Sequence, residues 1–437
     1  MSQRRWAVGL LCLGLAAGCG DPELTFFPGA GVLYVAQQAS ILVTSGGDGS
    51  DLVESSLKLV DGEGTAFGAQ ELQATEVSGD ETQFVVPAGI ATGKGTLSVE
   101  TSKGPSFSGE VGINRLMAMR DLSGKIWLLA LTGSGAGAQF AEAKAGNFGT
   151  GFGQVAIGYE GRLLATTSRS SGELFLAWVD PGLKPSTPHT ISTTETINDL
   201  LVTPNGVTLV ATSGGVYYAP APTQDPPVEP TLTLLNVGET VALAADPAGG
   251  KAAAVVDPGS SGNVALTILD LTMSPPLAVQ TLSTTWSGGG HALSVAMSSD
   301  GKSIVLVDGT DDKLALFGDG QTTPTEQSFP SGESGAVAIA AAPDGSTFYV
   351  ANKTSGNLSK VTVSAGAATF DSPLDLTSGS GAPVDVRAST SDEVVVLLEH
   401  DLVLLYDAGA KANTLKLTNL FADKVNGEVG GSLAIQP

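Results

Sequence analysis

Short, mostly apolar runs occur in pairs along this chain, and a tight turn with polar residues or glycine separates the two runs of each pair. Apolar runs of this length, bounded by turn residues, predict buried β-strands, and two such runs around a turn predict a hairpin. Six hairpins are expected in succession, at residues 155–167, 199–213, 241–257, 293–308, 338–352 and 384–398. Their turns lie 43 to 52 residues apart, at Tyr159, Pro204, Pro247, Ser299, Pro343 and Ser391. A repeat of short strands with a period in the forties is typical of an all-β propeller.

The two ends of the repeat complement each other. Counting 46 residues beyond the last turn reaches Pro437, in the fragment SLAIQP, which aligns with the first strand of a hairpin unit. At the other end, residues 116–131 match the second and third strands of the unit at 348–363. An open ring would leave sheet edges unpaired. The sequence therefore predicts a seven-bladed β-propeller over residues 115–437, with the first strand of blade one supplied by 431–437.

One unit of the repeat carries a recognisable pattern. Its turn reads Pro-Asp-Gly at residues 343–345, where proline presets the first turn torsion and glycine accepts a positive φ. The whole unit, AIAAAPDGSTFYVANKTSGNLSKVTV at 338–363, resembles the YVTN-type β-propeller repeat found in many bacterial envelope proteins. The resemblance covers about three quarters of the chain and implies a fold more than a function.

The first residues have the features of an export signal. Arg4 and Arg5 precede thirteen uncharged, mostly apolar residues, a stretch too short to span a bilayer. The stretch ends in LAAGC, which resembles the lipobox of bacterial lipoproteins and implies lipidation of Cys19. An ordinary signal peptide is the alternative. We expect a signal peptide over residues 1–18, and the glycine that follows Cys19 favours the outer membrane over inner-membrane retention.

The expected mature chain has the composition of an acidic globular protein. Cys19 is its single thiol, and 42% of the whole chain is hydrophobic, so a large core without disulfides is predicted. Loss of Arg4 and Arg5 takes the net charge from −23 to −25. Such a surface repels phosphate backbones and anionic head groups, which excludes nucleic acid as a partner. The membrane is expected to be contacted through the lipid anchor alone.

A separate β-domain is expected before the repeat. Residues 19–114 contain short strand patterns divided by glycine and aspartate turns, which predicts a small immunoglobulin-like β-sandwich behind the lipidated terminus. The segment at 85–104, VVPAGIATGKGTLSVETSKG, resembles the end of an IPT/TIG domain. A different type of β-sandwich is the alternative.

Residues suited to metal binding or catalysis are few. The chain has three histidines, His189, His291 and His400, and none has a second histidine or cysteine at metal-ligand spacing. His291 precedes the inner strand of the fifth blade, where it either faces the channel mouth or has a structural role. The acidic segments Asp308–Asp312 and Gly46–Asp51 lack the ligand count of a calcium loop, so solvated turns are expected. Trp127 and Trp178 are expected in the core between blades.

These observations predict a binding protein more than an enzyme. No catalytic residue, cofactor or metal site is assigned, and Cys19 is the only site residue. We expect a non-enzymatic binding or scaffold module of the bacterial cell envelope, whose partner is an envelope protein or a polysaccharide. The alternative is a propeller hydrolase or lactonase, because seven-bladed lactonases also resemble the repeat. That reading requires an arginine, a histidine and two carboxylates at one end of the channel.

Overall fold

The computed structural model of the protein describes residues 231–376 without interruption and, with gaps, residues 24–221 and 381–435. Within these residues the chain consists of β-strands, loops and one short 3₁₀ turn, η4 (Gly259–Ser261). No helix in the described part is long and apolar enough to cross a lipid bilayer. The all-β prediction is confirmed.

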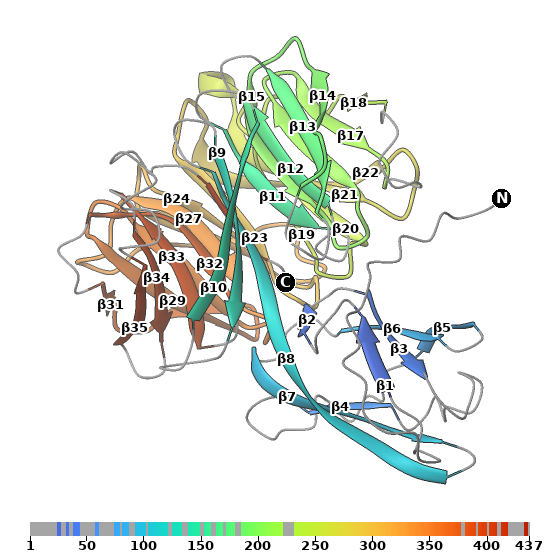
Figure 1. Ribbon diagram of the computed structural model, residues 1–437. Helices are drawn as coiled ribbons and strands as arrows, with labels where there is room; N and C mark the ends of the chain where they lie inside the picture. Colours follow the sequence, from blue (N-terminus) through green and yellow to red (C-terminus); the bar gives the residue numbers. More distant parts are fainter. Residues whose placement is uncertain are drawn as a thin grey trace.

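Two sheets come first in the chain. The first sheet has the order β1 (Leu24–Phe27), β3 (Gln38–Val43), β6 (Glu81–Val85) and β5 (Ala74–Ser78). The second contains β4 (Lys58–Val60), β7 (Gly93–Thr101) and the first part of β8 (Gly104–Arg120), and β2 (Val32–Tyr34) joins it as a parallel strand. Both sheets lie beside the larger part of the molecule in Figure 1.

The long strand β8 belongs to both parts of the molecule. Its residues up to Ile113 pair with β7, and its residues from Asn114 onward pair with β9 (Lys125–Thr132). Figure 1 shows β8 running from the N-terminal sheets into the larger part. The strand crosses the expected domain boundary, between residues 114 and 115, without a break.

The six expected hairpins are present, and each forms the first two strands of an antiparallel sheet whose strands follow chain order. The first three sheets contain β11 (Val155–Gly158), β12 (Leu163–Ser168), β13 (Glu173–Trp178) and β14 (His189–Ser192); β15 (Ile197–Val202), β16 (Thr208–Thr212), β17 (Gly215–Ala219) and β18 (Thr233–Leu235); and β19 (Thr240–Ala245), β20 (Lys251–Val256), β21 (Asn263–Asp270) and β22 (Leu277–Ser287). The next three contain β23 (Leu293–Met297), β24 (Ile304–Asp308), β25 (Lys313–Phe317) and β26 (Thr325–Ser328); β27 (Ala336–Ala341), β28 (Thr347–Asn352), β29 (Asn357–Ser364), β30 (Ala367–Phe370) and the short β31 (Leu374–Asp375); and β32 (Pro383–Ala388), β33 (Glu393–Leu398), β34 (Leu402–Asp407) and β35 (Ala412–Leu417).

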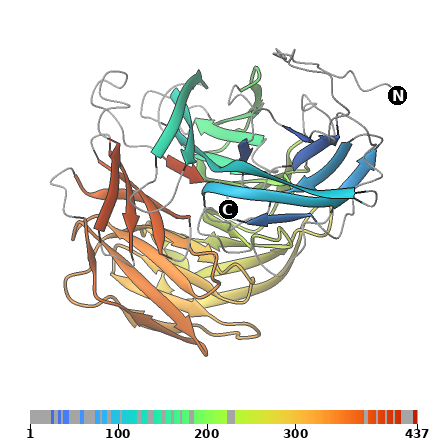
Figure 2. The same cartoon turned by 60° about the horizontal axis from the view of Figure 1, so that its bottom comes forward.

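The sheet that contains β8 also includes the C-terminal strand. β36 (Ser432–Ile435) pairs antiparallel with Met117–Arg120 of β8, which continues to β9 and β10 (Gln139–Asn147). β36 also contacts the first strands on both sides, β11 and β32. The remaining first strands contact one another in the order β11, β15, β19, β23, β27 and β32, and Figure 2 shows the sheets succeeding one another around a common centre.

The core lies between neighbouring sheets. Every described position of β12, β16, β24, β28 and β33 is buried, because each of these second strands has a sheet against both faces. Val305 and Val307 of β24, for example, pack in one cluster with Phe348 and Val350 of β28. A strand that is covered on both faces cannot show the simple alternation of a half-exposed strand. The valine- and alanine-rich composition of these strands follows from that burial.

The turn at residues 343–345 has the geometry that its sequence predicts. Gly345 has a φ of +77°, a backbone conformation that glycine adopts without steric cost. The Asp344 carboxylate accepts hydrogen bonds from the N–H groups of Ser346 and Thr347 and from the Thr347 hydroxyl. These bonds lower the pKa of Asp344 against the opposing effect of burial. The predicted role of glycine in this turn is confirmed.

Candidate functional site

The first strands of the sheets surround a central cavity of about 590 Å³. Alanine, valine, leucine and isoleucine form most of its wall, since small and branched side chains allow the strands to approach closely. Its charged lining residues are Asp199, Asp246, Asp385 and Arg387. This cavity is the central channel that the repeat predicts, and three of its charged side chains interact.

Asp385 joins the last full sheet to the C-terminal strand. The residue is 6% exposed and follows a β-bulge in β32. Oδ2 accepts a hydrogen bond from the backbone N–H of Leu433 in β36 at 2.9 Å. Oδ1 accepts from the N–H of Val386 at 2.8 Å and from Nη1 of Arg387 at 2.7 Å. The carboxylate therefore fastens β36 to β32.

Asp199 makes the corresponding connection between β15 and β19. It also follows a β-bulge, and a bulge redirects the side chain beside it. Oδ1 accepts from the N–H of Leu200 and Oδ2 from the N–H of Leu243 in β19, both at 2.8 Å. β19 and β27 have the same bulge but carry Ala242 and Ala338 at this position. The carboxylate connection is thus present at the bulges of β15 and β32 and not at those of β19 and β27.

The two channel carboxylates have raised pKa values. Burial raises the pKa of Asp199 from 3.8 to about 6, and the neighbouring Asp385 adds to this effect. The two backbone N–H donors and the Arg387 guanidinium act in the opposite direction. Burial also raises the pKa of Asp385, against the lowering effect of Arg387. One arginine therefore interacts with two carboxylates inside the channel.

The described lining residues of the channel include part of the catalytic group expected for a lactonase. Arg387, Asp199 and Asp385 interact as that reading requires, but the described lining residues include neither histidine nor cysteine. Both carboxylates also accept backbone N–H groups, which holds them in place as links between strands. Asp199 and Asp385 thus have a structural role in the channel, as links between neighbouring first strands.

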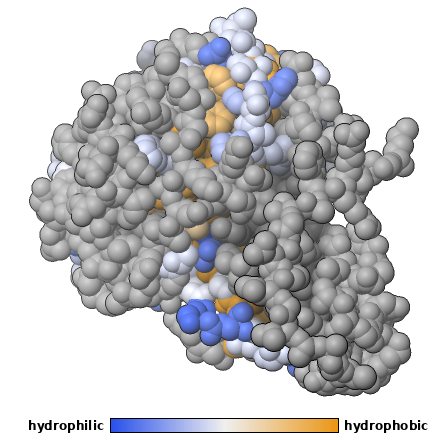
Figure 3. Space-filling model, viewed as in Figure 1, coloured by the Kyte–Doolittle hydropathy of each residue, from blue (hydrophilic) through white to orange (hydrophobic). Residues whose placement is uncertain are grey.

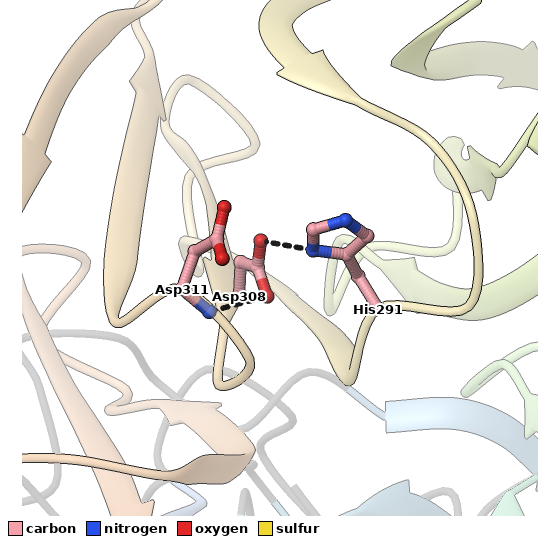
Figure 4. Close-up of side chains that lie close together, drawn as sticks. All are labelled: His291, Asp308 and Asp311. Atoms are coloured by element: carbon pink, nitrogen blue, oxygen red, sulfur yellow. Dashed lines mark hydrogen bonds and ion pairs between the residues drawn. The ribbon is translucent and has the colours of Figure 1, made fainter. Parts of the chain in front are cut away.

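A second cluster lies at the start of β23, where His291 contacts the end of β24. Nδ1 of His291 lies 2.7 Å from Oδ2 of Asp308, and the two side chains are 16% and 1% exposed. A carboxylate oxygen of Asp311 completes a group whose possible ligand atoms all lie within 4.8 Å of one another. Figure 4 shows the imidazole directed at Asp308, with the Asp311 carboxylate beside it. His291 is therefore engaged with this pair and is not among the described channel-lining residues.

Backbone donors hold this cluster from both sides. Oδ1 of Asp308 accepts from the N–H groups of Thr310 at 2.9 Å and Asp311 at 3.3 Å. Asp311 forms an exposed ion pair with Lys313, whose Nζ lies 2.9 Å from Oδ2, and this donor lowers the pKa of Asp311. In the segment expected to be a solvated turn, Thr310 and Asp311 are exposed but Asp308 is buried. The sequence did not predict its contact with His291.

The hairpin register explains why the cluster forms. Leu293 pairs with Asp308 across β23 and β24, and His291 lies two positions before Leu293. Residues separated by 17 positions in sequence therefore meet at one end of a hairpin. Aligning the histidine with its partner strand would have revealed the contact, whereas a search for closely spaced ligands did not.

The remaining residues considered in the sequence lie outside these two clusters. Trp127 and Trp178 are buried, and Trp178 packs in a cluster that spans two sheets, as expected for a blade interface. His189 begins the outer strand β14. Cys19, Gly46–Asp51 and His400 lie outside the described residues.

The outer strand β22 has an unusual surface. Its first five positions are all exposed, and the exposed large hydrophobic side chains of the described part are Met273, Leu277 and Val279, between 52% and 56% exposed. β14, another outer strand, alternates between half-buried and exposed positions. Figure 3 shows pale and blue described residues beside a group of orange ones on the face seen in Figure 1. β22 therefore exposes apolar side chains that the neighbouring sheets leave uncovered.

Comparison with known proteins supports the fold and does not identify a function. No family model and no curated protein matches the chain. A functionally unknown protein from Desulfotomaculum acetoxidans superposes with a TM-score of 0.54 at 12% identity, over 74% of this chain and 99% of that one. A chain of hydrazine synthase from Kuenenia stuttgartiensis gives a TM-score of 0.49 at 10% identity, over 69% and 94% of the two chains. Likeness at such identity shows the fold alone, and it supports a β-propeller.

Proposed function

We propose that this protein is a lipid-anchored, non-enzymatic binding or scaffold module of the bacterial cell envelope. The lipobox-like LAAGC sequence supports lipidation at Cys19 and a location at the outer membrane. The YVTN-like repeat supports an envelope protein, because repeats of this type are found there. The partner in this proposal is an envelope protein.

The architecture in this proposal is a seven-bladed YVTN-type propeller preceded by an immunoglobulin-like, IPT/TIG-like sandwich. Six sheets in chain order, together with the sheet β36-β8-β9-β10, support the blade count. The contacts of β36 with both β11 and β32 support a ring closed by the C-terminal strand. The two N-terminal sheets, one containing β1 and the other β4, support a two-layered sandwich.

The exposed edge of β22 is the observation that carries the binding proposal. Outer strands present unpaired N–H and C=O groups, and soluble proteins usually protect such edges with charged residues. β22, Leu277–Ser287, contains no charged residue although the chain has a net charge of −23. Near the end of the strand the N–H of Thr285 is bonded to the Glu326 carboxylate, so the docking edge in this proposal is the exposed first part, from Leu277 onward. Exposed apolar side chains beside a free edge are suited to the addition of an extended partner strand. An uncharged or basic segment of an envelope protein suits this edge, since the acidic remainder of the surface repels acidic partners.

The test compares lysine substitutions on two outer strands. Leu277→Lys and Val279→Lys place charge on the proposed edge, and Thr190→Lys places the same charge on β14. We expect the wild-type protein and Thr190→Lys to retain one envelope protein from solubilised membranes, and the β22 variants to lose it by at least about tenfold. Equal retention by all variants would contradict docking at β22.

The hydrolase alternative has one observation in its favour, the interaction of Arg387 with Asp199 and Asp385. Lactone and ester substrates should therefore be assayed with the same protein. Turnover that Arg387→Met abolishes would replace the binding proposal with the enzymatic one. We expect no turnover, because both carboxylates serve as links between strands.

A further inference from the structure

Two aspartates occupy corresponding places at the ends of second strands, and their oxygens are used differently. Asp257 follows β20, where Oδ1 accepts from the N–H groups of Gly259 and Gly289 and Oδ2 accepts from Gly290. Asp308 ends β24, where Oδ1 accepts two backbone N–H groups but Oδ2 faces the imidazole of His291. Both oxygens of Asp257 therefore accept backbone N–H groups of loops, whereas only Oδ1 of Asp308 does so. Oδ2 of Asp308 is bonded to Nδ1 of His291, so an ion that binds both atoms would replace this contact.

The loop that carries the histidine is held by Asp257 on one side and by Thr310 on the other. Asp257 binds the backbone immediately before His291, through the N–H groups of Gly289 and Gly290 at 2.9 Å each. On the other side, Thr310 Oγ1 accepts a hydrogen bond from the N–H of Ala292 at 2.9 Å. The loop that carries the imidazole is thus fixed at residues on both sides of it. Such fixed donors reduce the ordering cost when a ligand binds.

We propose that His291, Asp308 and Asp311 bind a divalent transition-metal ion. Nδ1 of His291 and one oxygen from each aspartate are the ligand atoms, and they already lie within 4.8 Å of one another. An ion with bond lengths of about 2.0–2.2 Å needs its ligand atoms roughly 3–4 Å apart, so small side-chain movements suffice. On binding, Nδ1 offers its lone pair and the neutral imidazole carries its proton on Nε2.

The ligand types decide which ion is bound. One imidazole nitrogen with two carboxylates suits Zn²⁺ and similar transition metals, whereas Ca²⁺ and Mg²⁺ take oxygen ligands. Three protein ligands leave at least one position on a tetrahedral ion for water or for a donor group of another molecule. Because Lys313 holds Oδ2 of Asp311 at 2.9 Å, this ion pair competes with the metal.

The experiment measures uptake of Zn²⁺ alone by the full-length protein after treatment with a chelator. Isothermal titration is expected to show one Zn²⁺ per chain, and His291→Gln should weaken binding at least about 100-fold. Asp311→Asn should weaken it at least about tenfold. Lys313→Met should tighten it by about 1.5- to 5-fold, because it frees Asp311 from an exposed ion pair. Co²⁺ should produce a visible spectrum that His291→Gln removes.

The matched control is Asp300→Asn. Asp300 forms a similar exposed pair with Lys302, with Nζ at 3.3 Å from Oδ2, in the turn between β23 and β24. This variant should bind Zn²⁺ like the wild type, and Ca²⁺ should not compete at equal concentration. Absence of Zn²⁺ uptake by the folded wild-type protein would overturn the proposal. Uptake that is unchanged in both His291→Gln and Asp311→Asn would overturn it as well, even if Asp308→Asn fails to fold.

Discussion

The Asp385 link to the C-terminal strand can be tested by substitution. Asp385→Ala removes the acceptor of the Leu433 N–H and of the Val386 N–H, and it removes the anion beside Arg387. Each buried N–H left without an acceptor costs about 1–3 kcal/mol. The raised pKa of Asp385 shows that burying its charge is itself unfavourable, which offsets part of this cost. We expect a net loss of about 2–4 kcal/mol in the free energy of unfolding.

Hydrogen exchange locates the effect. Since the lost bond reaches β36, the amide of Leu433 should exchange roughly 30-fold faster or more in Asp385→Ala, which corresponds to about 2 kcal/mol. Asp199→Ala is the matched control, because it removes an equivalent link between β15 and β19 without touching β36. It should lower stability while leaving the relative protection of Leu433 unchanged. Equal protection of Leu433 in Asp385→Ala and the wild type would refute the reasoning.

Two further predictions concern pH and lipidation. The pKa of Asp199 is about 6 in the folded protein against 3.8 as its ordinary value, so the folded state holds this proton more tightly. The free energy of unfolding should fall as pH rises from about 4 to 6, by up to about 3 kcal/mol from this group, and urea unfolding of Asp199→Asn should lack that part of the fall. An identical pH slope in both proteins would contradict the assignment. Cys19→Ser should abolish labelling by a fatty-acid probe, and undiminished labelling would exclude lipidation at Cys19.

The hairpins could be predicted from sequence because their causes are local. A short apolar run marks each strand of the hairpins, and Pro343 with Gly345 fixes one turn through torsion preferences that hold in any fold. The spacing of the turns revealed the repeat, since each four-stranded blade needs a similar length of chain before the next blade begins at the centre. The buried tryptophan Trp178 also followed from its place in a third strand.

The tertiary structure decided the roles of individual polar side chains. Nothing local distinguishes Asp199 or Asp385 from a solvated aspartate; each becomes a link because a bulge turns it toward the N–H of a neighbouring strand. The exposed face of β22 likewise depends on what the next sheet leaves uncovered.

The sequence by itself determined the strands, the turns and the repeat of this protein, since periodicity and torsion preference act over a few residues. Only the tertiary structure brought His291 to Asp308 and Asp311, because a contact between distant residues depends on strand register. It also revealed that β8 continues from the N-terminal sheets into the propeller. Register and burial depend on how strands pair and pack, and the sequence of one strand does not specify which strand pairs with it.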